Sequence, residues 1–164
     1  MCSSFVREFL ELLFVRGHSF GIGVSRNSNR SLANGKAKTS TAWPPKLVLK
    51  VLASGTAVLE RLDASGMEEM ITLYSVDGDG IALVHYCPTN NQPRMRVVPS
   101  SDDVKELSFD YQGAGNLKSP TAGHQHHLVI RFDDADHITE TWTWRAKDKD
   151  TPMVFHFTRK KLDQ

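Results

Sequence analysis

The chain has 164 residues, of which 40% are hydrophobic and 24% charged, values typical of one soluble globular domain with its own core. A formal net charge of +1 argues against a global electrostatic attraction to nucleic acid or to a membrane surface. No apolar run reaches the length that spans a bilayer, and two cysteines, Cys2 and Cys87, are too few for a disulfide framework.

Residues 1–45 differ in composition from the rest of the chain. Residues 1–50 carry eight Lys/Arg and two Asp/Glu, a net of +6, whereas residues 51–164 carry twelve and seventeen, a net of −5. Apolar residues at three-to-four spacing predict a short helix over 4–16, and the Gly-, Ser- and Asn-rich composition of 17–45 predicts a flexible basic extension. Charged residues interrupt the apolar stretch, which argues against a secretory signal and favours a cytoplasmic protein. An organellar presequence and a misassigned start site are the alternatives.

From Lys46 onward the pattern is that of short strands separated by turn residues, so residues 46–164 are expected to form a single domain. The expected strands are Leu47–Leu52, Thr56–Leu62, Glu69–Ser75, Ile81–Cys87, Arg94–Val98, Glu106–Tyr111, Gln125–Phe132, His137–Arg145 and Met153–Lys160. The first two are alternatively one strand with a bulge at Ser54–Gly55. This rhythm predicts an all-β, antiparallel up-and-down barrel of about eight strands. The connection 112–123 is expected to cover one mouth.

Two groups of polar side chains point to a site. Strand alternation places His85 and Cys87 on one face and Tyr86 on the other. The same rule places His124 and His126 on the face of Leu128, Ile130 and Phe132. Each strand thus has an apolar stripe that ends in polar residues, and the two polar ends are expected to converge at one mouth of the barrel.

His85, Cys87, His124 and His126 are the residue types that bind zinc or iron, and a metal or haem centre is one interpretation of them. The competing interpretation, which we favour, is that they are hydrogen-bonding groups at a half-wet barrel mouth, with no cofactor. A cupin site would need a glutamate about four residues after the second histidine, where this chain has Ile130. A nucleophilic Cys87 lacks any local catalytic motif, so the sequence leans away from an enzyme.

Asn91, Gln92 and Arg94 follow the first group and are candidates for ligand contacts, the arginine for a carboxylate or a phosphate. The alternative is that they form a chain-reversing turn, with a solvated arginine. Trp142 and Trp144 share a strand face and either line an apolar cavity or fill the core. The sheet has no basic stripe interleaved with aromatics, so nucleic acid is not an expected partner.

The segments MITLYSVDGDGIALVHYCPTNNQPRM, AGHQHHLVIRFDDADHITETWTWR and VFHFTRKK resemble a family of small, mostly bacterial lipocalin-like proteins of uncharacterised function. The similarity extends over about residues 46–161 and is most specific in the pair HYC and NQPRM. It implies a calycin-type barrel, related in architecture to fatty-acid-binding proteins and nitrobindin-like haem barrels, and it implies no activity. The family's opening strand is not recognisable in residues 1–45, which leaves the closure of the barrel open.

These observations predict a lipocalin-like barrel that binds a small apolar or amphipathic molecule. The expected contacts are His85, Cys87, Asn91, Gln92, Arg94, His124, His126, Trp142 and Trp144. A metal- or haem-dependent protein that uses the same histidines is the first alternative, and a structural domain without a ligand is the second. The sequence does not specify an oligomeric state.

Overall fold

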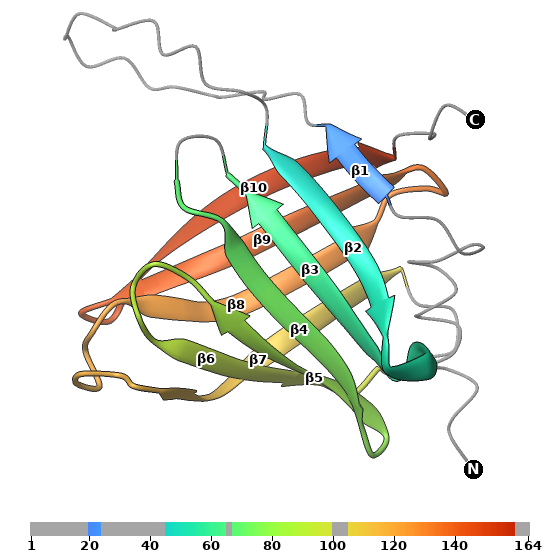
Figure 1. Ribbon diagram of the computed structural model, residues 1–164. Helices are drawn as coiled ribbons and strands as arrows, with labels where there is room; N and C mark the ends of the chain where they lie inside the picture. The colour runs from blue at the N-terminus through green and yellow to red at the C-terminus, as the bar shows by residue number, and fades with distance from the viewer. Residues whose placement is uncertain (1–19, 24–44, 65–66, 100–104, 160–164) are drawn as a thin grey trace, which may run out of the picture.

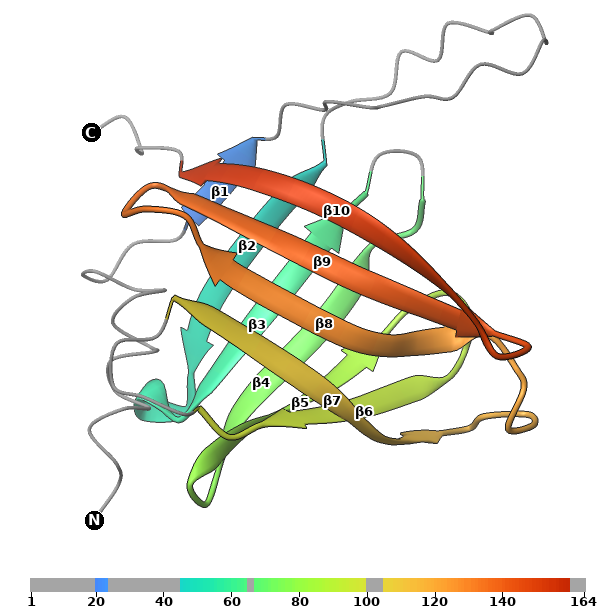
Figure 2. The same cartoon turned by 180° about the vertical axis from the view of Figure 1, so that it is seen from behind.

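The computed structural model describes residues 20–23, 45–64, 67–99 and 105–159, and these form an antiparallel β-barrel (Figures 1 and 2). The strands are β1 Phe20–Gly23, β2 Lys46–Leu52, β3 Ala57–Asp63, β4 Met70–Asp77, β5 Gly80–Tyr86, β6 Gln92–Val97, β7 Glu106–Gly115, β8 His124–Phe132, β9 His137–Ala146 and β10 Lys149–Arg159. None of the described residues forms a helix with the length and hydropathy of a membrane span. The helix expected over 4–16 lies outside the described residues.

The nine strands β2 to β10 form an up-and-down meander, in which each strand pairs antiparallel with the next. The prediction of an all-β antiparallel barrel is therefore confirmed. The first two predicted strands are separate, because a 3-10 turn at Ala53–Gly55 divides them and Ser54 adopts a positive φ of 55°. The 112–123 connection was predicted too long: β7 continues to Gly115, so only residues 116–123 join it to β8.

The sequence did not predict β1. This strand pairs with the end of β10 on one side and with β2 on the other, and so closes the barrel. It has four residues and lies within a segment whose composition predicted a flexible extension. A short run of this kind, FGIG, gives little alternation for a sequence pattern to detect.

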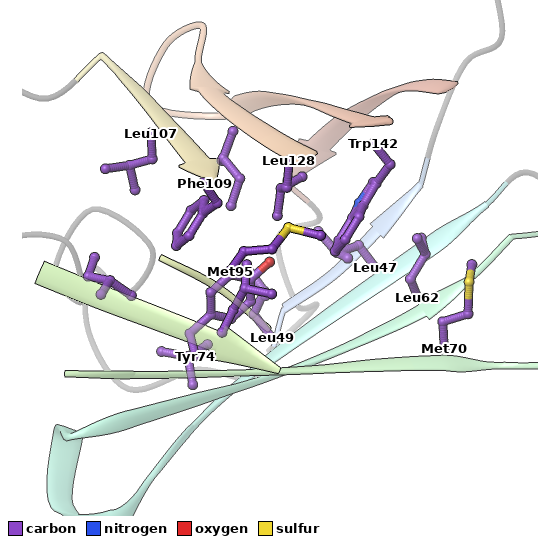
Figure 3. Packing of buried hydrophobic residues seen from close by; sticks show 14 of the residues in the cluster. Leu47, Leu49, Leu62, Met70, Tyr74, Met95, Leu107, Phe109, Leu128 and Trp142 are labelled. Atoms are coloured by element: carbon purple, nitrogen blue, oxygen red, sulfur yellow. The ribbon is translucent and has the colours of Figure 1, made fainter. Parts of the chain in front are cut away.

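Alternating burial along the strands defines the barrel interior. In β5, Ile81, Leu83 and His85 are buried, while Tyr86 is exposed. Side chains from several strands meet inside, as Figure 3 shows for Tyr74, Met95, Phe109, Leu128 and Trp142. Burial of large apolar surfaces such as these supplies most of the free energy that holds a barrel together.

Candidate functional site

Three polar side chains form one cross-strand row inside the barrel. The strand register pairs Glu60 with Thr72 and Thr72 with His85, and each residue is 1% exposed. Thr72 Oγ1 lies 3.0 Å from Glu60 Oε1 and 3.0 Å from His85 Nδ1. The single hydroxyl proton of Thr72 goes to the carboxylate, so the Nδ1–H of His85 donates to the hydroxyl oxygen. His85 Nε2 is therefore an unprotonated acceptor.

Glu60 meets a second buried carboxyl group, that of Glu140 from the opposite strand β9. Tyr74 Oη donates to Glu60 Oε2 at 2.8 Å, and Trp142 Nε1 donates to Glu140 Oε2 at 3.0 Å. Burial raises the pKa of Glu60 to about 7, against the lowering effect of donors from Tyr74, Thr72 and Glu140. Burial and the charge of Glu60 raise the pKa of Glu140 well above its usual range. Glu140 thus holds a proton and donates it to Glu60, and the pair carries one negative charge once the pH rises above about 7.

The ring of His85 packs against the indole of Trp142, with 4.5 Å between the ring centroids. Burial lowers the pKa of His85 to about 4, so the ring is neutral at physiological pH. Among the described residues, no hydrogen-bond partner reaches its Nε2 atom. A buried acceptor without a partner carries a free-energy cost, and this marks the atom as a candidate ligand contact.

Two further buried acceptor atoms have no hydrogen-bond partner among the described residues. Asn91 Nδ2 donates to the Gly123 carbonyl at 2.9 Å, which fixes the orientation of the amide and leaves Oδ1 without a partner among the described residues. Gln125 Oε1 is likewise buried and unpartnered there. Asn91 is 5% exposed and Gln125 4%. Like His85, both lie where β5 ends and where β6 and β8 begin, an end of the barrel that we call the 87–91 end (Figure 1).

His124 and His126, at the same end, form an ordered hydrogen-bond chain. Arg145 is held by Asp150 and can only donate, so His126 Nε2 accepts from its guanidinium. His126 Nδ1–H then donates to His124 Nε2 at 3.0 Å, and His124 Nδ1–H donates to the Ala122 carbonyl at 2.8 Å. Burial, followed by the charge of Arg145, lowers the pKa of His126. The ring of His126 is therefore neutral, and the nitrogens of both rings take part in hydrogen bonds that hold the start of β8.

A β-bulge in β8 changes which side chains of this strand are buried. The register to β9 shifts between Gln125 and His127, so alternation is interrupted there. Leu128 and Ile130 are buried as predicted, but Gln125 is buried as well and His126 only half-buried. The prediction that His124 and His126 simply continue the apolar stripe was wrong for this reason.

The structure separates the other predicted site residues. Arg94 lies exposed in β6 between buried neighbours, so it does not point into the barrel. Cys87 is half-buried and its Sγ lies 2.8 Å from Thr89 Oγ1, while Gln92 is half-buried at the start of β6. Within the described part of the chain, no three His, Cys, Asp or Glu side chains are arranged to hold a metal ion. The four histidine and cysteine residues therefore do not form one ligand set.

The two tryptophans differ in their surroundings. Trp142 is 1% exposed and belongs to the core, as the packing interpretation predicted. Trp144 is half-buried in β9 and its indole covers Gly123: a Cβ atom there would lie 2.2 Å from Trp144 Cζ2. Only glycine at position 123 leaves room for this ring to pack against the backbone before β8. The same residue provides the carbonyl that accepts from Asn91.

Sequence reasoning missed most of the buried polar cluster. The missed residues are Glu60, Thr72, Tyr74, Gln125 and Glu140. A signal was present for two of them, because Glu60 and Glu140 occupy positions that strand alternation assigns to the apolar face. A charged residue in such a position is a candidate buried group.

These features define a small antiparallel β-barrel with an acidic polar cluster inside and unpartnered acceptors at one end. A scan against models of protein families finds no match, and a search among curated proteins finds none either. The lipocalin-like resemblance of the motifs thus stays a prediction, and the function is argued from the chain's own residues.

Proposed function

We propose that this protein binds a small amphipathic molecule at the 87–91 end of its barrel. The observation that carries the proposal is a set of three buried acceptor atoms that have no partner among the described residues: His85 Nε2, Asn91 Oδ1 and Gln125 Oε1. Leaving a buried polar atom unpaired costs about 1–3 kcal/mol, so a ligand whose donor pairs with such an atom gains a corresponding binding energy. Binding sites for small molecules typically combine an apolar lining with a small number of polar groups.

The apolar part of the site comes from residues near the same end. Leu62 and Met70 are buried at the end of β3 and the start of β4, and they belong to the hydrophobic core (Figure 3). Trp144 is half-buried beside Gly123. The interior further along is occupied by side chains such as Phe109 and Leu128. We therefore place the ligand at the end of the barrel and not along its whole axis, as in a deep lipocalin-type pocket.

Native mass spectrometry and a fluorescent probe test this proposal. The protein purified without detergent is expected to carry a non-covalent small molecule that is lost on denaturation. After removal of that molecule, N-phenyl-1-naphthylamine, an uncharged aromatic probe with one N–H donor, is expected to bind at one equivalent and quench tryptophan emission through Trp144. The absence of both a retained molecule and saturable probe binding would overturn the proposal.

A further inference from the structure

We propose that the ligand bound at the 87–91 end carries a primary ammonium group on an apolar body, and that anionic amphiphiles are excluded. The inference rests on the proposed function and specifies its ligand class. It follows from two independent features of the site: the hydrogen-bond roles of the unpartnered atoms, and the sign of the buried charge.

The first feature is that all three unpartnered atoms are acceptors. His85 Nε2 accepts because its Nδ1–H is committed to Thr72, and Asn91 Oδ1 accepts because its Nδ2 is committed to Gly123. Gln125 Oε1 is a carbonyl oxygen and can only accept. An ammonium group carries three N–H donors and no acceptor, so it can pair with acceptors of this kind. An ionised carboxylate has no donor, and its lone pairs would face the lone pairs of these acceptors.

The second feature is that the buried charge is negative and has no buried counterion among the described residues. Glu60 and Glu140 share one proton, and the buried polar residues otherwise comprise threonines, histidines and amides, with no lysine or arginine. Several arginines pair instead with acidic residues at the surface, as Arg61 does with Glu69 and Arg96 with Asp77. A cation entering this interior gains Coulomb energy, and an anion loses it, in a medium of low dielectric constant.

The test compares three probes with the same ten-carbon chain: decylamine, decanol and decanoate, each below its micelle concentration. Binding to ligand-free protein is measured at pH 8, where Glu60 is mostly ionised and decylamine keeps its proton, by tryptophan fluorescence and by titration calorimetry. Decylamine is expected to bind at least about 10-fold tighter than decanol, a ratio equal to one hydrogen bond of about 1.4 kcal/mol, and decanoate weakest. Decanoate binding as tightly as decylamine would overturn the inference while leaving the proposed function intact. Failure of all three probes would overturn the proposed function itself.

A substitution at Gln125 adds a second readout. Gln125→Met keeps the length of the side chain but removes the acceptor, so decylamine affinity is expected to fall by about 10-fold, with decanol affinity changing less. His127→Gln is the matched control in the same strand, since His127 bonds Ser108 outside this cluster. Circular dichroism and the thermal midpoint of each variant report folding. A folded Gln125→Met variant with an unchanged ratio of decylamine to decanol affinity would count against the inference. If the variant does not fold, the comparison of the three probes on the unsubstituted protein still tests the inference.

Discussion

The protons on the histidine rings are placed by neighbouring groups whose role as hydrogen-bond donor is fixed. Thr72 has one hydroxyl proton, which it gives to Glu60, and Arg145 has donors alone. These two constraints place the proton of His85, and those of His124 and His126, on Nδ1. Of the three rings, that of His85 has a buried Nε2 without a partner among the described residues. Neighbouring groups thus use both nitrogens of His124 and of His126 to hold the start of β8, whereas His85 keeps one nitrogen available for a ligand.

The carboxyl pair gives the first prediction. Glu140→Gln preserves both hydrogen bonds, because an amide N–H donates to Glu60 and the amide oxygen accepts from Trp142. Glu60→Gln replaces an acceptor of two hydroxyl donors, from Thr72 and Tyr74, by a group that offers one acceptor. At pH 8 we expect Glu60→Gln to lower the free energy of unfolding by about 1–3 kcal/mol and Glu140→Gln to leave it unchanged or raised. Urea denaturation checks this, and the reverse order would refute our assignment of the proton.

The pH dependence of the same variants has a defined sign. Glu60 holds its proton more tightly in the folded state, with a pKa of about 7, than in the unfolded chain. The stability contribution of this protonation is thus present below pH 4.5 and is lost as the pH rises through about 7. Glu140→Gln keeps a permanent donor on Glu60, so the fall in stability between pH 6 and 8 is expected to become smaller than in the unsubstituted protein.

His85 provides a second prediction with the opposite sign. Its pKa is lowered from 6.5 to about 4 by burial, so the unfolded chain takes up the proton first. The contribution of neutral His85 to stability is complete above pH 6.5 and is lost as the pH falls toward about 4. NMR titration of the imidazole resonances is expected to show this ring titrating at about pH 4, well below 6.5. A His85 signal that titrates near 6.5 would show that the ring is hydrated and not buried as described.

At the scale of single strands, β8 shows where sequence patterns succeed and where they fail. Alternation placed Leu128 and Ile130 on one face, and both are buried in the structure. It failed at the start of β8, because one extra residue in a bulge shifts the alternation and has no pattern of its own in the sequence. The missed acid cluster has a different cause. A glutamate is stable in the interior only when other groups hydrogen-bond to it. Here those groups lie on other strands, and local sequence does not show which strands face each other across the barrel.

The contact between Gly123 and Trp144 leads to a prediction at this scale. In Gly123→Ala the new Cβ atom would lie 2.2 Å from Trp144 Cζ2, so the indole must move and stability is expected to fall by about 1–3 kcal/mol. In a Trp144→Phe background the same change is expected to cost less, with a coupling of at least about 0.5 kcal/mol in a double-mutant cycle. Gly78→Ala is the control, since its Cβ meets nothing within 4 Å and its cost comes from a φ of +61° alone. Equal costs of Gly123→Ala in both backgrounds would exclude the steric contact.

At the scale of the whole molecule, the barrel depends on a strand of four residues. β1 is hydrogen-bonded to β10 and to β2, and without it these two strands would present unpaired backbone edges. Sheets with such edges tend to pair with other molecules. The sequence pattern predicted the meander of nine strands but not this closing element, whose pairing is between opposite ends of the described chain.

Substitution of Ile22 tests the closure. Ile22 pairs with Arg159 on β10 and with Leu47 on β2, and Ile22→Pro removes its backbone N–H and restricts its backbone angle. We expect the free energy of unfolding to fall by about 1–3 kcal/mol and size-exclusion chromatography to show concentration-dependent association. Ile22→Val retains the N–H and is expected to stay monodisperse to the same extent as the unsubstituted protein. Identical behaviour of both variants would mean that β1 does not contribute to closure in solution.

The position of β1 also has a consequence for the order of events during synthesis. Ribosomes release the chain from its N-terminal side, so β1 emerges before the other described strands and its partner β10 after all of them. The meander from β2 onward can pair strand by strand as it appears, through contacts between sequence neighbours. The final seam must wait, because its two sides are separated by more than a hundred residues. Until β10 has been synthesised, the nascent sheet has two unpaired strand edges. A chaperone that covers strand edges would act during this period.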